Sequence, residues 1–117
     1  MEMISFGVYR LVPAMRMIEK DGVPIELGSR ALDILIVLVE HAGEVVPCKA
    51  LLSRVWRGLI VDPSGLRVHI AGLRKALGDG KDGARYIVNI HGQGYSFVAP
   101  MRRATRLEPE IQEAWQP

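Results

Sequence analysis

The sequence has 117 residues, of which 49% are hydrophobic and 24% charged, with a formal net charge of +2; these values fit one globular domain and exclude a disordered chain. The longest apolar run, residues 34–39, is far shorter than a transmembrane helix, and no secretion signal is recognisable. The shortness of this run predicts that there is no membrane segment. Because the single cysteine, Cys48, cannot form an internal disulfide, nothing indicates an oxidising compartment, and we expect a cytoplasmic protein.

The first 27 residues are expected to form a small antiparallel sheet. Residues that favour strands occupy 6–11, 15–18 and 23–27. Asp21-Gly22 lies between the second and third of these runs, and Asp-Gly in that position is typical of a tight β-hairpin.

Three helices are predicted after the strands. Residues 30–42 contain no proline or glycine, and their apolar residues recur at helical spacing. Ser29 fits the N-cap of this helix, and Gly43 fits its end. A short second helix is predicted for 48–56, after Pro47.

The third helix has the clearest boundary signals. Asp62 can cap it, Pro63 fits its first position, and Gly78 stops it after Leu77. Four apolar residues at spacings of 4, 3 and 4 stack on one of its faces: Leu66, Ile70, Leu73 and Leu77. We expect this face to point into the core.

Two strands, 86–90 and 95–98, are predicted to follow and to be joined by a glycine-rich hairpin tip at 91–94. This order predicts an α+β fold: a winged helix-turn-helix with an N-terminal antiparallel sheet, three helices and a C-terminal β-hairpin wing. The domain is predicted to cover 1–100. Residues 101–117 show little pattern and are expected to be a tail or the start of a linker, with at most a brief helix.

Basic residues concentrate in the middle of the chain. Residues 49–85 carry eight Lys or Arg against three Asp, whereas residues 1–48 carry four against seven acids. A basic region on an acidic frame is expected of a polyanion binder, and a solvated helical surface explains the same pattern equally well.

The side of the third helix opposite its leucines predicts a DNA-binding face. It carries small side chains together with cations on its flanks: Ser64, Arg67, Val68, His69, Ala71, Gly72, Arg74 and Lys75. Such a face suits close approach to a major groove, where Val68 can meet a thymine methyl and the arginines can reach phosphates or guanine edges. An ordinary solvated face is the alternative interpretation.

The hairpin tip is a second candidate contact. Two glycines bracket Gln93 and permit a tight turn, so a tip carrying His91 and Gln93 can enter a minor groove. A surface turn without a partner is the alternative. A nucleotide-binding loop is not expected here, because a strand rather than a helix follows the glycines.

Catalysis is not expected. The thiol and imidazole groups belong to separate elements and lack metal-ligand spacing, so we expect no metal and no cofactor: His41, Cys48, His69 and His91. Cys48 lies in the first turn of a helix, where a thiol can be reactive, but a half-buried structural cysteine is the preferred interpretation.

Several ordered motifs resemble the DNA-binding effector domain of OmpR/PhoB-type response regulators, in the N-terminal placement found in ToxR/CadC-like regulators. The resemblance covers 6–98 and is carried by these segments: 27–32 (LGSRAL), 42–46 (AGEVV), 51–52 (LL) with 55–56 (VW), 66–70 (LRVHI) with 73–78 (LRKALG), 86–88 (YIV) and 92–97 (GQGYSF).

This resemblance implies bacterial transcription regulation, as found in phosphorelay signalling: sequence-specific binding of double-stranded DNA by a recognition helix at 63–77 and a wing at 91–96. It also implies a four-stranded N-terminal sheet, base-facing positions that include Gly65, and a backbone contact or neighbouring position at Trp56. Further implied partners are a fused or separate sensory domain, a second copy bound head to tail on DNA, and RNA polymerase, contacted by the loop Arg57, Gly58, Leu59, Ile60 and Val61.

The sequence departs from this family in the recognition helix and in the wing. Ala71 and Gly72 stand where basic or polar residues are common, and Gln93 and Ser96 replace two wing arginines. Because each lost phosphate contact weakens binding, we expect a weak DNA binder as an isolated monomer, with avidity from a dimer or a fused domain. The alternative function is a winged-helix protein-interaction module with weak or no DNA binding.

Overall fold

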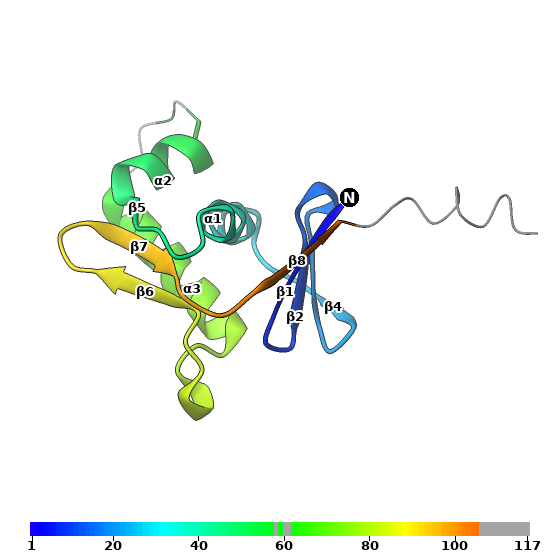
Figure 1. Cartoon of the computed structure of the whole chain (residues 1–117). Coiled ribbons are helices and arrows are strands. Elements are labelled where there is room, and N and C mark those ends of the chain that lie inside the picture. The colour runs from blue at the N-terminus through cyan, green and yellow to red at the C-terminus, as the bar shows by residue number, and fades with distance from the viewer. Residues whose placement is uncertain (58, 60–61, 106–117) are drawn as a thin grey trace, which may run out of the picture. The chain divides into compact units, whose positions relative to one another are not determined.

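The computed structural model describes residues 1–57, 59 and 62–105, and the chain divides into two units (Figure 1). The first unit comprises Met1–Glu26 together with the segment that begins at Pro100, and the second comprises Leu27–Ala99. Within the part of the chain that the structure describes, no helix is both long and apolar enough to cross a membrane.

The first unit is a five-stranded antiparallel sheet. Its strands follow the spatial order β4-β3-β2-β1-β8 and have these bounds: β1 Glu2–Phe6, β2 Tyr9–Val12, β3 Met17–Lys20, β4 Val23–Ile25 and β8 Arg102–Thr105. Ile4 pairs with Leu11, Leu11 with Ile18, and Ile18 with Ile25. Side chains alternate between the two faces of a strand, so these aligned residues form one apolar face, of which Ile4, Leu11 and Ile18 are fully buried.

The N-terminal strands agree with the prediction except in two places. The strand predicted at 6–11 is interrupted by a turn that separates β1 from β2, and the strand predicted at 15–18 starts later because Pro13–Met15 forms a 3-10 turn. At the predicted hairpin both Asp21 and Gly22 have positive φ, as a tight hairpin turn requires. The four-stranded N-terminal sheet implied by the resemblance is present, and β8 extends it.

The prediction of a patternless tail from residue 101 is wrong for Arg102–Thr105. This segment forms β8, which pairs with β1 along its whole length, and Arg103 makes an ion pair of 3.1 Å with Glu2. All four of its residues are exposed, so β8 has no apolar alternation by which the sequence could reveal a strand. Residues 106–117 lie outside the described residues, and the domain boundary predicted at residue 100 stays a prediction.

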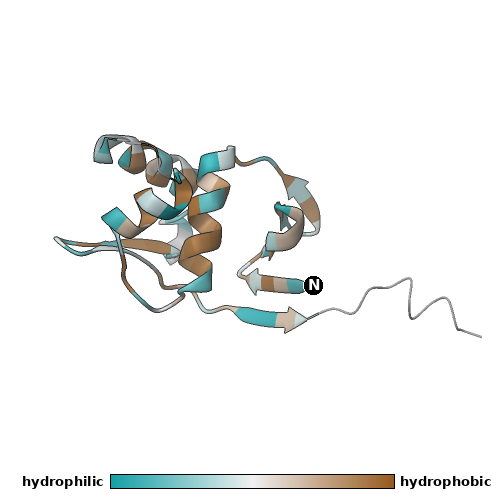
Figure 2. Ribbon diagram, turned by 90° about the horizontal axis from the view of Figure 1, so that it is seen from above, coloured by the Kyte–Doolittle hydropathy of each residue, from teal (hydrophilic) through white to brown (hydrophobic). Residues whose placement is uncertain are grey.

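The second unit consists of three helices and a three-stranded sheet of order β5-β7-β6. The bounds are α1 Ser29–Glu40, β5 Val46–Pro47, α2 Cys48–Val55, α3 Pro63–Leu77, β6 Ile87–Ile90 and β7 Gly94–Phe97, with a 3-10 turn at Lys81–Gly83. Helix α1 contacts α2, α3 and β7 and is therefore the centre of this unit. Figure 2 shows hydrophobic stretches along the helices and hydrophilic residues at the tip of the hairpin.

Helix α1 starts and ends slightly earlier than predicted. It begins at Ser29 with Gly28 as the N-cap, so the predicted capping residue is one position off. After the helix, the backbone N–H of Gly43 donates to the carbonyl of Phe97 at 2.9 Å, which fixes the exit of α1 against β7. The predicted winged helix-turn-helix, an α+β fold, is the observed architecture.

Candidate nucleic-acid interface

Helix α3 has the boundaries that its capping residues predict. Asp62 is the N-cap, and its carboxylate accepts a hydrogen bond from the backbone N–H of Ser64 at 2.9 Å. The backbone N–H and the hydroxyl of Ser64, with a smaller contribution from the charge of Arg67, lower the pKa of the Asp62 carboxyl below its ordinary value. Gly78 ends the helix in the left-handed conformation.

The inner face of α3 is fixed by four residues of the second unit's core. Leu66, Ile70, Leu73 and Leu77 are at most 2% exposed. A helix held by four buried residues cannot rotate about its axis without exposing them, and burying one such side chain is worth about 1.5–3 kcal/mol. The face that α3 presents to solvent is therefore determined by this packing.

The outer face of α3 is open. Ser64, Arg67, Val68, Ala71, Gly72 and Lys75 are all exposed, and Gly65 is half-buried. Val68 is 70% exposed although it is a large apolar residue, and a methyl group added at Gly72 would meet no atom within 4 Å. Small side chains and Val68 occupy the middle of this surface, with Arg67 on one flank and Lys75 near the C-terminal end of the helix.

Arg74 is engaged with the hairpin rather than fully extended into solvent. Its Nε donates to the carbonyl of Ile87 at 3.1 Å, and its guanidinium carbon lies 6.0 Å from the centre of the Tyr95 ring. These contacts join α3 to both strands β6 and β7. The structure thus gives Arg74 a structural role, and its predicted contact with DNA stays a prediction.

Asp79 also connects the end of α3 to the hairpin, a role that was not predicted from the sequence. Its Oδ2 accepts hydrogen bonds from the backbone N–H groups of Tyr86 at 3.1 Å and Ile87 at 2.9 Å. The backbone N–H of Asp79 in turn donates to the carbonyl of Arg74. An acid placed directly after the helix-ending glycine was the available signal, but its partners lie seven and eight residues away and cannot be read from local spacing.

Trp56 and His69 form an aromatic contact beside the outer face. Their ring centres are 5.6 Å apart, Trp56 is only 8% exposed and His69 is half-buried. Arg30 places its guanidinium carbon 5.5 Å from the centre of the Trp56 ring and donates to the carbonyl of Val55 at 2.7 Å. Trp56 therefore supports His69 from the inside, and Arg30 is a residue of this cluster that the sequence did not reveal.

The hairpin β6–β7 exposes its tip. His91 and Gln93 are exposed in the turn between the strands, and the backbone N–H of Gln93 donates to the carbonyl of Ile90 at 2.9 Å. Ser96, by contrast, is 4% exposed and faces the interior. The tip is therefore polar and accessible, but the second position where the resemblance expects a wing arginine is buried here.

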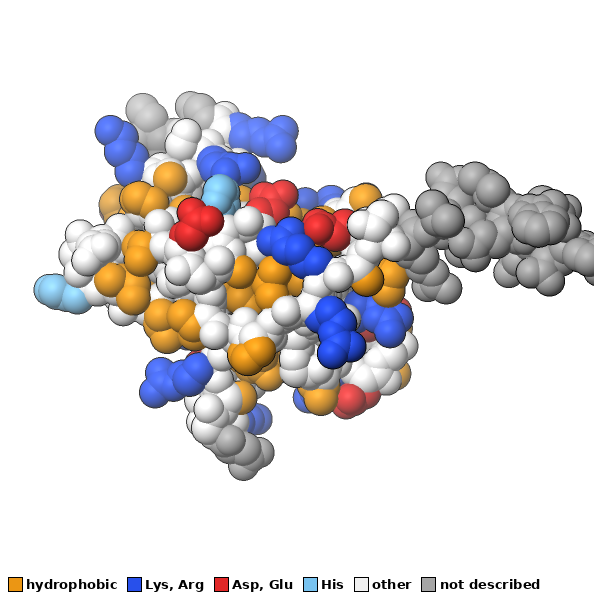
Figure 3. All heavy atoms as spheres, in the orientation of Figure 1, with side chains coloured by type: hydrophobic (Ala, Val, Ile, Leu, Met, Phe, Trp, Pro, Cys, Tyr) orange, Lys and Arg blue, Asp and Glu red, His pale blue; other side chains and the backbone are white. Residues whose placement is uncertain are grey.

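Cations also surround α2. Figure 3 shows Lys and Arg side chains in the region of this helix. Lys49, Arg54 and Arg57, on and directly after α2, are exposed. Arg54 makes an ion pair of 3.8 Å with Glu40 and lies 2.9 Å from Nε2 of His41, so part of this charge is balanced locally.

The predicted polymerase-contact loop is described in part. Arg57 and Leu59 are exposed, whereas Gly58, Ile60 and Val61 lie outside the described residues. Over the ranges 1–57, 59 and 62–105, no group of three or more His, Cys, Asp or Glu side chains is placed to hold a metal ion, and Cys48 is half-buried at the start of α2.

Comparison with known proteins gives consistent matches over most of the chain. The family model described as "Transcriptional regulatory protein, C terminal" matches residues 22–97. The transcriptional activator CadC of Escherichia coli K12 is 29% identical over 99 residues, which are 84% of this chain and 19% of that protein. The transcriptional regulator HilA of Salmonella typhimurium is 40% identical over 77 residues, which are 66% of this chain and 14% of that protein. The chain thus spans less than a fifth of either relative.

Solved structures agree in fold. The DNA-binding domain of E. coli CadC superposes with a TM-score of 0.76 at 27% identity, over 87% of this chain and 96% of that domain. The DNA-binding domain of Klebsiella pneumoniae RstA, solved in complex with the RstA box, superposes with a TM-score of 0.70 at 32% identity, over 82% and 96% of the two chains.

Proposed function

Because this chain belongs to the family of transcriptional regulatory protein C-terminal domains, the OmpR/PhoB-type winged-helix DNA-binding domains, we propose that it binds specific double-stranded DNA sequences with α3 in the major groove and the tip of β6–β7 at the adjacent minor groove. The observation that carries this proposal is the exposed outer face of α3, which carries small side chains and Val68 in its middle together with Arg67 and Lys75. The opposite face of the helix is buried in the core. A B-DNA major groove admits a helix with such a profile.

The residues of the outer face divide by the part of DNA they would contact. Small residues let the α3 backbone approach base edges, and the exposed methyl groups of Val68 suit a thymine methyl. Arg67 and Lys75 reach phosphates, where they supply affinity without sequence information. His69 would contact the sugar-phosphate backbone at the edge of the groove, and its ring contact with Trp56 supports this role.

The hairpin tip would supply the second contact. His91 and Gln93 are exposed there, and glutamine is suited to the acceptor pattern of a minor groove. Since no arginine stands at position 93 or 96, fewer phosphates are neutralised, and we expect weak binding by a single copy. Two copies on a direct repeat, head to tail, would restore affinity through avidity.

The remaining partners belong to the same proposal. A domain that binds operator DNA works in the cytoplasm, without catalysing a reaction, and receives its signal from a sensory domain in the same or another chain. The loop from Arg57 to Val61 would contact RNA polymerase, and the support for this is the exposure of Arg57 and Leu59.

Selection from a random duplex pool, followed by fluorescence anisotropy with the enriched sequence at several salt concentrations, tests the function. Lys75→Ala removes one phosphate contact, so the slope of log affinity against log salt should become shallower by about 1. Lys20→Ala, which removes the same charge from an exposed position on β3, is the matched control and should leave the slope unchanged. A folded chain that enriches no sequence and binds no duplex at low salt would contradict the proposal.

A protein-interaction module is the second candidate, and one observation favours it. Arg74, one of the cations predicted to contact DNA, is engaged within the domain instead, because it contacts β6 and β7. In that case duplex binding would be absent, and replacing Arg67 and Lys75 would not affect the function of the chain. The dependence of duplex affinity on salt concentration in the parent chain distinguishes the two functions, because a DNA interface must lose affinity as salt rises.

A further inference from the structure

Four of the five methionines of the chain follow one pattern. They form two Met-x-Met pairs, Met1 with Met3 and Met15 with Met17, and the fifth is Met101. Residues two apart in an extended chain point to the same face of a sheet. This rule places Met1 and Met3, at the start of β1, on one side of the sheet. Met15 ends the 3-10 turn and Met17 begins β3, so for this pair the structure, not strand alternation, shows that both side chains reach the same place.

The register of the sheet brings the two pairs together. Ile4 pairs with Leu11, and Val12 pairs with Met17, so Met3 on β1 and Met17 on β3 flank Val12 from its two sides. These side chains lie on the face opposite Ile4, Leu11 and Ile18. Residues from the start of the chain and from the β2–β3 connection thus become neighbours through strand pairing.

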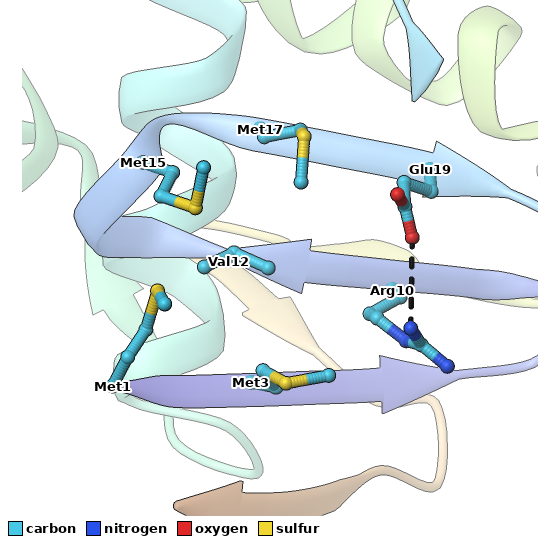
Figure 4. Close-up of a pocket in the computed structure, with 7 residues that line it drawn as sticks. All are labelled: Met1, Met3, Arg10, Val12, Met15, Met17 and Glu19. Atoms are coloured by element: carbon cyan, nitrogen blue, oxygen red, sulfur yellow. Dashed lines mark ion pairs between the residues drawn. The ribbon is translucent and has the colours of Figure 1, made fainter. Parts of the chain in front are cut away.

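The structure shows that all four methionines line one open cavity of about 150 Å³, which we call the methionine cavity (Figure 4). Its other lining residues are Val12 and the ion pair of Arg10 with Glu19, at 3.8 Å. The pair lies at one end of the cavity in Figure 4, and its two charges balance.

Core packing does not explain this cluster. Met15 is 57% exposed and Met1 is 43% exposed, whereas the opposite face of the same sheet is buried by isoleucine and leucine. Met1 and Met15 gain little from burial at such positions, while Met3 and Met17 beside them are half-buried. A gathering of exposed large apolar side chains is a feature of binding surfaces. What the four side chains have in common, and what leucine would lack, is the thioether sulfur.

We propose that the methionine cavity binds one Cu(I) ion through thioether sulfurs of Met1, Met3, Met15 and Met17. Soft thioether ligands select Cu(I), whereas Zn²⁺, Mg²⁺ and Ca²⁺ require nitrogen, thiolate or oxygen ligands. Methionine has three rotatable side-chain bonds, so the sulfurs can close around an ion without moving the strands. This site lies in the first unit and is independent of the DNA contacts assigned to α3.

The test uses the full chain, with an intact mass that verifies Met1, in a Cys48→Ser background that removes the thiolate as a competing ligand. Cu(I) is titrated without oxygen against the chromophoric chelator bicinchoninate. We expect the chain to withhold one equivalent of Cu(I) from the chelator. With ¹³C-methyl methionine, the methyl resonances of the four cavity methionines should shift on titration, and that of Met101 should not.

The variant Met3→Leu/Met17→Leu removes two sulfurs at nearly constant side-chain volume, so the sheet should remain folded. It should weaken Cu(I) binding by about tenfold or more, because soft ligands dominate the affinity for this ion. Met101→Leu is the matched control and should bind as the parent does. The proposal is overturned if the Cys48→Ser chain withholds no Cu(I), if the double variant binds as tightly as the parent, or if Met101 shifts with the others.

Discussion

The backbone of Gly94 lies against β5 at the start of β7, with φ at +154°. A methyl group built on it would collide with the carbonyl oxygen of Val46 and would lie 2.8 Å from the Cα of Pro47. Neither contact can be relieved by a flexible side chain, because both neighbours are backbone. Position 94 therefore requires glycine for two reasons: the backbone of β5 lies too close for a side chain, and the turn has a positive φ there.

We predict that Gly94→Ala lowers the free energy of unfolding by roughly 3 kcal/mol, from backbone strain together with displacement of β5. Urea denaturation followed by circular dichroism measures it. Gly22→Ala is the control: its φ of +82° is also unfavourable for alanine, but nothing lies within 4 Å, so its cost should be about 1 kcal/mol. Equal losses in the two variants would show that the approach of β5 contributes nothing.

Val68 allows the apolar part of the proposed major-groove contact to be tested separately from charge. We predict that Val68→Ala weakens binding to the selected duplex by about fivefold, the effect of burying roughly one of the two carbon atoms that the substitution removes, without changing the salt slope or the stability of the chain. Val23→Ala is a suitable control, because Val23 is 62% exposed, close to the 70% of Val68, and belongs to the first unit. An unchanged affinity for Val68→Ala would remove Val68 from the interface.

Among elements, α3 was the most completely predicted. Asp62, Pro63 and Gly78 are local signals, and each fixes a boundary through the backbone of its immediate neighbours. The four buried positions followed from helical spacing alone. The sequence could not predict the contacts of Arg74 and Asp79 with the hairpin, because their partners depend on where the following strand lies.

The cap of α3 should make stability depend on pH. Asp62 has a lowered pKa in the folded chain, so its charged form is favoured by folding, and its contribution is complete above the ordinary pKa of 3.8 and lost as the pH falls through the lower folded value. We predict that Asp62→Ala is less stable than the parent near neutral pH and that this difference narrows below pH 3.8. Thermal unfolding over this range measures it. The control Asp62→Asn caps without titrating, so its difference from Asp62→Ala should stay constant.

The connection between α3 and the hairpin should depend on Asp79. We predict that Asp79→Ala destabilises the chain by roughly 2 kcal/mol, because two partly buried N–H groups lose their acceptor. Hydrogen exchange should rise at the amides of Tyr86 and Ile87 first. Asp62→Ala, which removes an acid from the other end of α3, should leave exchange at these two amides unchanged, and a uniform rise in both variants would contradict a local role.

In the molecule as a whole, the order of elements could be predicted from the sequence, but the addition of β8 to the edge of the first sheet could not. Hydrophobic alternation, turn residues and the family resemblance identified four N-terminal strands, three helices and a hairpin. Strand β8 was not predicted, because its side chains are all exposed and it is held by backbone pairing with β1. On the proposed interface, the exposed side of α3 followed from the sequence, whereas the support of His69 by Trp56 and Arg30 required the structure.

Removing β8 tests where the domain ends. We predict that a chain truncated after residue 100 melts at a lower temperature than the full chain, by roughly 4–8 °C for each kcal/mol lost, and self-associates through the uncovered edge of β1. Calorimetry and light scattering after size exclusion measure the two effects. A full chain with Arg103→Ala keeps the backbone pairing and should lose little, since it removes an exposed ion pair. A truncated chain as stable and monomeric as the parent would place the boundary at residue 100, as the sequence indicated.

The pairing of β1 with β8 also has a consequence for synthesis. Glu2 and Arg103 are 101 positions apart, so β1 leaves the ribosome long before its edge partner exists. During synthesis, β1 is therefore an unpaired edge strand of the nascent first unit while the second unit is translated. Such distant pairing also raises contact order, so acquisition of the last strand should be a late and slow event in refolding.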